Sequence, residues 1–224
     1  MPESEDRSID PTLVQAAVFD MGGVLLEGGP SDVAAFGSRV GLDKASWDVL
    51  RFEVFGNGGA WSALERGEIS LDSFVEHLKN EIIKVGGSVD TELAAQFMGD
   101  RTPMAQRQRI REDLIEWVGR VKEVVPTALL TNNVVEWRTG WNQMLDVDAL
   151  FDVIVDSSEV GTRKPEPEIY EITRERLDVA HENIFFVDDI GQNLKAAKRL
   201  GWQTLLFRRG EDLVDVLKAI CNNN

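Results

Sequence analysis

The second half of the chain alternates short apolar runs with longer amphipathic runs, and this alternation limits the possible folds strongly. The runs that we expect to be strands span residues 127–131, 153–156, 184–187 and 203–207. Helical patterns follow them near residues 134–145, 166–177, 191–200 and 211–220. Strands that alternate with helices in this way form parallel sheets with helices on both faces. We therefore predict an α/β fold built on a doubly wound parallel sheet.

One more apolar run, residues 16–19, lies near the start of the chain and lacks the polar alternation of a half-exposed strand. It is therefore predicted to be a buried strand of the same sheet. Asp20 follows it directly, and Gly22 and Gly23 allow a sharp turn just beyond. Ligands of such folds bind beyond the carboxyl ends of the strands, so Asp20 is a candidate for contact with a ligand.

Between this strand and the second half, the pattern is wholly helical from residue 31 to about residue 98. Ser70 begins a capped amphipathic helix, and Gly86 marks its end. The helical pattern resumes near Ala105 and runs to about Glu123. We predict a disordered tail over residues 1–12, a core over 13–30 and 100–221, and a helical cap over 31–99.

Composition restricts the partners. The 224-residue chain carries a net charge of -15, which repels nucleic acid and anionic membrane surfaces. Cys221 is the only cysteine, so an internal disulfide is excluded and a reducing compartment is compatible. Neither a signal peptide nor a long apolar span is evident. We expect a cytoplasmic protein with neither nucleic acid nor membrane as partner, and the oligomeric state stays open.

Polar residues also follow two later strands. Thr131, Asn132 and Asn133 end the second predicted strand, where an Asn could cap the next helix. Alternatively, the Thr131 hydroxyl and free backbone amides would bind a phosphate. Lys164 stands before Pro165 at the expected start of a helix, where it is either a solvated lysine or the positive charge of a site.

The last polar pair is Asp188 and Asp189, after the strand at 184–187. These residues could cap a helix, but adjacent carboxylates in a crevice repel unless a cation lies between them, and oxygen ligands suit Mg²⁺. Taken with Asp20, Thr131 and Lys164, the pair describes a site of positioning and charge neutralisation, which is what phosphoryl transfer requires.

Four segments carry a family resemblance, namely FDMGGVL, LLTNN, RKPEPEIY and FFVDDIGQNLKAAKRLGW. With them the chain resembles hydrolases of the haloacid dehalogenase superfamily, in the group with a helical cap inserted after the first strand. The match covers residues 16–207. It is most similar to phosphatases related to the N-terminal domain of soluble epoxide hydrolase and to a bacterial sugar 1-phosphate phosphatase, and the segment LERGEIS resembles the caps of that group.

The resemblance implies a role for each of the polar residues at the strand ends. Asp20 would attack phosphorus and form an aspartyl-phosphate that water cleaves, and Lys164 would neutralise Asp20 and the phosphoryl group. Asn193 would brace the loop. The implied substrate-binding residues are Thr131, the Asn132 amide and Lys164, and the implied Mg²⁺ ligands are Asp20, the carbonyl of Gly22 and Asp189, with Asp188 reaching the ion directly or through water.

One position departs from the family pattern. Phosphatases of the superfamily commonly carry a second Asp two residues after the nucleophile, where this chain has Gly22. That Asp protonates the leaving group, and a general acid contributes roughly 10²–10⁴-fold in rate. We predict one of three consequences. Hydrolysis is slow, or the enzyme prefers substrates whose leaving groups need little protonation, such as sugar 1-phosphates or acyl phosphates, or a proton donor comes from the cap or from the substrate. The related sugar 1-phosphate phosphatase is similar in having this Gly.

Two other functions fit part of the pattern. A 2-haloacid dehalogenase would use the same nucleophile and needs no proton donor, but it gives the pair Asp188 and Asp189 no role. A non-catalytic module that binds phosphate esters would explain only Gly22. A phosphatase acting on a phosphorylated small molecule accounts for all of the polar residues at the strand ends.

The aromatic residues of the predicted cap and a group of arginines are not assigned a role in the site. The aromatic residues of the predicted cap either form its core or wall a substrate pocket, and they are Trp47, Phe52, Phe55 and Trp61. The glycine-rich segment 55–61 could form a loop over the site. Four arginines near the junction of cap and core are expected to form a solvated cluster, at positions 101, 107, 109 and 111.

Overall fold

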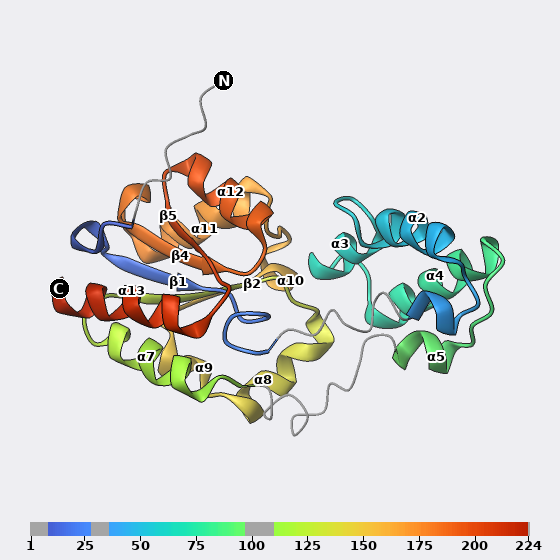
Figure 1. Cartoon of the computed structure of the whole chain (residues 1–224), viewed down its shortest axis with the longest axis horizontal. Helices are drawn as coiled ribbons and strands as arrows, with labels where there is room; N and C mark the ends of the chain where they lie inside the picture. Colours follow the sequence, from blue (N-terminus) through green and yellow to red (C-terminus); the bar gives the residue numbers. More distant parts are fainter. Residues whose placement is uncertain (1–8, 28–35, 97–109, 224) are drawn as a thin grey trace.

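The computed structural model describes residues 9–27, 36–96 and 110–223. Its centre is a five-stranded parallel sheet with the order β3-β2-β1-β4-β5 (Figure 1). The strands are β1 (Ala16–Phe19), β2 (Thr127–Thr131), β3 (Val153–Asp156), β4 (Ile184–Asp188) and β5 (Gln203–Leu206). All five predicted strands are present within one residue of their expected ends, and the predicted α/β fold is confirmed.

Helices cover both faces of the sheet, as Figure 1 shows. One face packs against α7 (Glu112–Lys122), α9 (Val147–Leu150) and α13 (Gly210–Asn223), and the other against α11 (Pro167–Leu177) and α12 (Gly191–Leu200). Successive residues of β1 alternate between the two cores: Ala17 and Phe19 belong to one, Ala16 and Val18 to the other. Both faces are buried, which explains the continuous apolar run.

Short elements connect the sheet to these helices. They are η1 (Pro11–Leu13), η2 (Val135–Trp137), α8 (Arg138–Met144), α10 (Ser157–Val160) and η3 (His181–Asn183). Regular structure begins inside the last residues of the predicted tail, because the Asp10 side chain caps η1 and its backbone N–H donates to Gln203 Oε1 at 2.7 Å. Residues 1–8 lie outside the described part of the chain.

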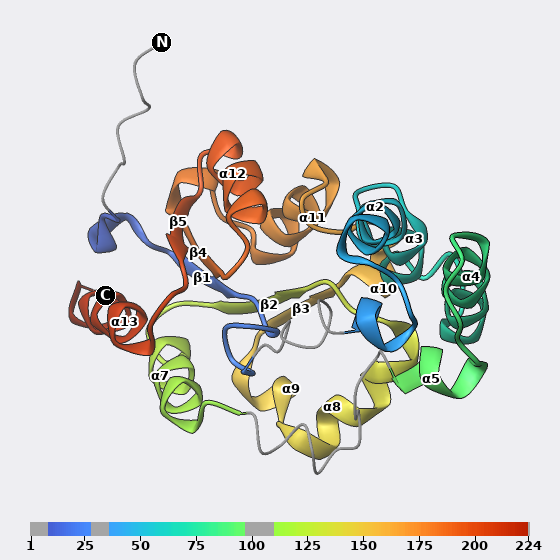
Figure 2. The same cartoon turned by 45° about the vertical axis from the view of Figure 1, so that its right-hand side comes forward.

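The remaining helices are α2 (Lys44–Phe55), α3 (Ala60–Glu65), α4 (Leu71–Lys84) and α5 (Thr91–Gln96), which we call the cap. They have a core of their own, around Trp47, Leu50, Phe74 and Leu78. Ser70 caps α4 through a bond from the Ser73 amide, as its sequence predicts. In both views the cap lies to one side of the sheet, with α3 beside α10 (Figures 1 and 2).

The helix predicted over 105–123 is wrong at residues 110 and 111, which are not helical. Residues 105–109 lie outside the described residues, and α7 begins only at Glu112. Ile110 instead pairs with Leu26 in an antiparallel bridge, because the chain there lies against the turn after β1. The proposed domain boundaries and the cytoplasmic location stay predictions. In the part of the chain that the structure describes, no helix combines the length and apolarity that crossing a bilayer requires.

Candidate active site

A cavity of about 360 Å³ lies between the carboxyl edge of the sheet and the cap. From the core it is lined by residues that include Asp20, Gly22, Thr131, Asn132, Lys164 and Asn193. From the cap it is lined by Phe55, Asn57, Trp61 and Glu65. The structure therefore brings the predicted catalytic and substrate-binding residues together around one space, although they are up to 144 positions apart in the sequence.

Lys164 lies at the centre of the polar contacts. Its Nζ lies 2.8 Å from Asp20 Oδ1 and 2.7 Å from Asp188 Oδ2, and it donates to the Leu130 carbonyl at 2.8 Å. The side chain is only 1% exposed, so the solvated interpretation of this lysine is wrong. Burial opposes the charge, but the carboxylates of Asp188 and Asp20 outweigh burial, and the pKa of Lys164 is raised. The raised pKa favours a charged Lys164 at the centre of the site.

Asp20 follows β1 and is buried, with 6% of its surface exposed. Its backbone N–H donates to the Val187 carbonyl at 3.1 Å, and its Oδ1 accepts from the Met21 amide at 2.8 Å. Burial raises the pKa of Asp20 to about 7, against the opposing charge of Lys164. The carboxylate is thus held in one orientation at the cavity wall and is poorly solvated.

The two carboxylates after β4 have different surroundings. Asp188 is fully buried, and its oxygens accept from Lys164 Nζ, from Asn193 Nδ2 at 3.1 and 3.0 Å, and from the Ile190 amide at 2.7 Å. Asn193 braces this loop, as the resemblance implies. Asp189 Oδ1 is buried without a hydrogen-bond partner among the described residues. Burial and the neighbouring Asp188 raise the pKa of Asp189.

The carboxylate cluster fits a divalent cation. Asp20, Asp188 and Asp189 each offer an oxygen, and the three oxygens lie within 4.8 Å of one another. An oxygen-only set with an unpaired buried carboxylate oxygen suits Mg²⁺. The donors already on Asp188 leave Asp20 and Asp189 as the more available carboxylates. Gly23 makes this cluster possible, since its φ is +87° and a Cβ there would lie 2.2 Å from Asp189 Oδ2.

The segment after β2 supplies hydrogen-bonding groups. Thr131 Oγ1 makes only a long contact of 3.5 Å, to the Asn132 carbonyl, among described residues. The Asn132 side chain bonds both backbone groups of Lys164, accepting from its N–H at 2.8 Å and donating to its carbonyl at 2.9 Å. The helix-cap interpretation of these asparagines is wrong, because Val134 is the N-cap of η2. Asn132 instead holds the backbone of the buried lysine.

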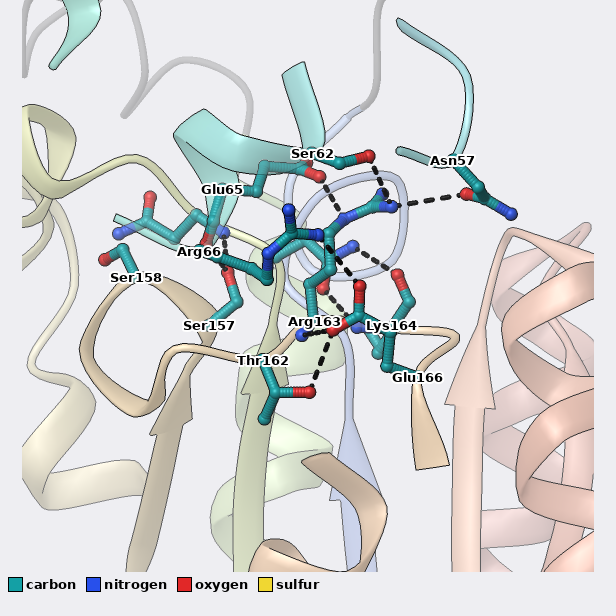
Figure 3. Close-up of polar contacts among 12 residues, drawn as sticks. Asn57, Ser62, Glu65, Arg66, Ser157, Ser158, Thr162, Arg163, Lys164 and Glu166 are labelled. Carbon is teal, nitrogen blue, oxygen red and sulfur yellow. Dashed lines mark hydrogen bonds and ion pairs between the residues drawn. The ribbon is translucent and has the colours of Figure 1, made fainter. Parts of the chain in front are cut away.

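Sequence reasoning missed an ion pair across the cap and the core. Arg163, next to Lys164, places Nε 2.6 Å from Glu65 Oε2 of α3 (Figure 3). Both interpretations of the cap aromatic residues hold in part. Phe55 and Trp61 line the cavity and also pack against the cap core, and Trp47 is buried in that core. Phe52 does neither, since it is 80% exposed. The segment 55–61 contributes Phe55, Asn57 and Trp61 to the wall.

A second missed residue is Arg111. Its Nη1 donates to the carbonyls of Gly23, Val24 and Leu26 at 3.1, 2.7 and 3.2 Å, and its guanidinium lies 5.0 Å from the centroid of the Phe207 ring. The prediction of a solvated arginine is wrong here, because the turn after β1 exposes carbonyls that need a donor. The arginines at 101, 107 and 109 lie outside the described residues.

Comparison with known proteins agrees with this geometry. A family model described as haloacid dehalogenase-like hydrolase matches residues 14–201. Acyl-CoA dehydrogenase family member 10 of Mus musculus is 30% identical over 215 residues, which cover 92% of this chain and 19% of that protein. The chain likewise covers 39% of bifunctional epoxide hydrolase 2 of Sus scrofa, at 26% identity over 92% of this chain. It thus spans less than half the length of these relatives.

Two further relatives are similar over most of their length. Sesquiterpene phosphatase astK of Aspergillus oryzae is 29% identical, with 85% of this chain and 88% of that protein covered. D-ribitol-5-phosphate phosphatase of Bacteroides thetaiotaomicron is 23% identical, with 94% and 100% covered. Among solved structures, a HAD family enzyme of the same bacterium, in complex with magnesium and inorganic phosphate, has a TM-score of 0.62 at 22% identity, with 89% and 96% covered.

Proposed function

Because the chain belongs to the haloacid dehalogenase-like hydrolase family, we propose that it is a Mg²⁺-dependent phosphatase that hydrolyses phosphate monoesters of small molecules. The observation that carries this proposal is the arrangement around Asp20. The buried Lys164 contacts the Asp20 carboxylate, and the Thr131 hydroxyl, which makes only a long 3.5 Å contact among the described residues, lines the same cavity. A buried oxygen of Asp189 has no hydrogen-bond partner among the described residues. These groups match a phosphoryl group and a divalent cation.

In this function Asp20 attacks phosphorus, a bond forms between its carboxylate oxygen and phosphorus, and the bond to the leaving-group oxygen breaks. Water then cleaves the aspartyl-phosphate and releases inorganic phosphate. Lys164 neutralises negative charge on Asp20 and the phosphoryl oxygens, while the Thr131 hydroxyl and the Asn132 amide donate to those oxygens. When bound by Asp20, Asp189 and the Gly22 carbonyl, with Asp188 beside them, Mg²⁺ would supply further positive charge.

Relatives support the reaction class and the metal. Two carry the name phosphatase, and a structural relative binds magnesium and inorganic phosphate. Their names point to different leaving groups, a terpenoid and a polyol, so the leaving group does not follow from the comparisons. We expect good leaving groups such as sugar 1-phosphates to react fastest, because Gly22 offers no acid to protonate a departing alkoxide.

The alternatives explain less of the site. A dehalogenase expels halide and leaves the carboxylate cluster around Asp189 without a purpose. A non-catalytic binding module accounts for Gly22, but it does not require a lysine buried against the candidate nucleophile. Both remain measurable outcomes of one assay.

That assay follows release of 4-nitrophenol from 4-nitrophenyl phosphate with MgCl₂ or with EDTA. Hydrolysis should depend on the metal and should fall by about 10⁴-fold or more in Asp20→Asn, which keeps the shape but removes the nucleophile. Asp48→Asn, in α2 and outside the cavity lining, where the Asp48 side chain is 41% exposed, is the matched control and should behave as wild type. Phosphate-ester binding without release would support the binding module, and chloride release from 2-chloropropionate would support the dehalogenase.

A further inference from the structure

The cap end of the cavity carries a charged pair that the proposed chemistry does not use. We propose that Arg163 and Glu65 bind hydroxyl groups of the leaving group and thereby select phosphates of polyols or sugars over phosphates of hydrocarbon alcohols. This inference rests on the proposed phosphatase function and adds the residues that choose among its substrates.

The position of the pair supports this role. Arg163 directly precedes Lys164 in the chain, and both residues line the cavity that Asp20 lines, so the pair belongs to the same site as the nucleophile. Arg163 Nε lies 2.6 Å from Glu65 Oε2, and its Nη1 donates to Ser62 Oγ at 3.1 Å and to Asn57 Oδ1 at 3.3 Å. Figure 3 shows the guanidinium held among these three cap residues.

The pair still has hydrogen-bonding capacity to offer a ligand. The side chains of Arg163 and Glu65 are 11% and 9% exposed, and Nε and Oε2 face each other at 2.6 Å. A guanidinium carries five N–H donors. Nε faces Glu65 and Nη1 donates to Ser62 and Asn57, which leaves Nη2 without a hydrogen-bond partner among the described residues. A buried ion pair stabilises only when its remaining donors and acceptors are satisfied. A hydroxyl meets this need from both sides, since it accepts from Arg163 and donates to Glu65.

Charge and shape restrict the partner further. Glu65 already neutralises Arg163, so a second acidic group on the substrate would meet a carboxylate rather than a free cation. Phe55 and Trp61, whose ring centroids are 5.7 Å apart, offer apolar faces to C–H groups beside the polar pair. A cavity of about 360 Å³ is near the lower end of ligand pockets, which span roughly 300–1,000 Å³. A small neutral polyol matches all three features.

The cap is fastened to the core next to this pair by contacts that do not line the cavity. Arg66 Nη1 lies 2.9 Å from Glu166 Oε1, and Ser157 Oγ donates to the Glu65 carbonyl at 2.6 Å. Arg66 therefore provides a matched control. Its removal weakens attachment of the cap while leaving the polar wall of the cavity intact.

The experiment compares sorbitol 6-phosphate with hexyl phosphate, which share a six-carbon chain and a primary ester oxygen and differ in hydroxyl groups. For wild type we expect kcat/KM to favour the polyol ester by about 100-fold or more, because a hydrocarbon leaves buried polar groups unpaired. Arg163→Met and Glu65→Gln should each lower this ratio at least about tenfold. Arg66→Met should leave the ratio unchanged. Comparing ratios between variants cancels the difference in leaving-group basicity.

Three outcomes would overturn the inference: wild type favours hexyl phosphate, the Arg163 and Glu65 variants keep the wild-type ratio, or Arg66→Met lowers it as much as they do. If circular dichroism shows that Arg163→Met does not fold, Glu65→Gln decides, because it keeps the side-chain shape. The 4-nitrophenyl phosphate assay separates the two proposals. If that substrate is cleaved with dependence on Asp20 and Mg²⁺, the phosphatase stands and only the selection by Arg163 and Glu65 is refuted.

Discussion

The two ends of the cavity are built in different ways. At the core end, Asp20, Thr131 and Asp188 each stand at the carboxyl end of a strand, and the sheet register places them side by side. At the cap end, Asn57 comes from the loop between α2 and α3 and Glu65 is the last residue of α3, and both meet Arg163 because the cap docks there. A change at the core end should therefore affect every substrate, whereas a change at the cap end should alter the preference among substrates.

The largest effect is expected at the core end, from Lys164→Met. It leaves Asp20 and Asp188 buried without their cation, and breaking a buried pair in this way costs about 3–5 kcal/mol. We also expect kcat/KM to fall by about 10³-fold or more for aryl and alkyl phosphates alike, since charge stabilisation is lost for every leaving group. Urea denaturation in EDTA and steady-state kinetics measure the two effects.

The matched control for this lysine is Lys44→Met, because the Lys44 side chain is 90% exposed and pairs with Asp48 of the same helix. It should change neither stability nor rate appreciably. If Lys164→Met lost activity toward only one class of leaving group, the core end would also select among substrates. The difference in role between the two ends of the cavity would then be refuted.

The next effect is a gain. Gly22 lines the cavity and a Cβ added there meets nothing within 4 Å, so Gly22→Asp introduces the missing carboxyl group without a clash at Cβ. We expect kcat for hexyl phosphate to rise by about 100-fold and that for 4-nitrophenyl phosphate to change little, because only the alkoxide needs a proton. Gly22→Asn, which has the same size but no acid, is the control. Equal gains in both variants would show that the carboxyl group is not acting as an acid.

A smaller effect is expected from Arg111, which supports the core end from a distance. Arg111→Met removes the donor to three carbonyls of the turn after β1, and the free energy of unfolding should fall by about 2 kcal/mol. Because this turn follows Asp20, kcat should drop by about tenfold on all substrates, with their ratio preserved. A changed ratio between sorbitol 6-phosphate and hexyl phosphate would mean that the turn also contacts the leaving group.

The sequence predicts the core end far better than the cap end, and the reason is physical. An apolar run that ends in Asp20 or in Asp188 identifies both the strand and the side chain at its edge, so position in the chain gives position in the site. Helical periodicity identifies the buried stripe of the cap but does not tell which residue faces another subdomain. Glu65 belongs to such a helix, and its partner Arg163 lies 98 positions later in the chain.

The two missed arginines show the same limit. From the sequence, Arg111 is expected to be solvated and Arg163 receives no role, because the groups that each contacts lie far away in the chain. Their partners come from the turn after β1 and from α3. A usable signal for Arg163 is its place beside Lys164, since a residue adjacent to a buried site residue lies at the edge of that site.

The smallest effect is a pH dependence at the cap end, measured with Glu65→Gln. Burial raises the pKa of Glu65 above its ordinary value of 4.5, despite the opposing charge of Arg163, so the folded protein binds this proton more tightly than the unfolded chain does. The contribution of Glu65 to stability is therefore complete below pH 4.5 and is lost as the pH rises through the interval above it. Gln does not titrate. The stability of Glu65→Gln relative to wild type should therefore increase as the pH rises above 4.5, as urea denaturation in EDTA would show. Glu68→Gln is the control of opposite sign. The hydrogen bond from Arg66 lowers the pKa of the exposed Glu68, so Glu68 stabilises the fold above its unfolded pKa. The stability of Glu68→Gln relative to wild type should therefore decrease as the pH rises. If the stability of both variants relative to wild type changed with pH in the same direction, the Glu65–Arg163 pair would not be desolvated. The cavity end of the cap would then behave like its exposed surface.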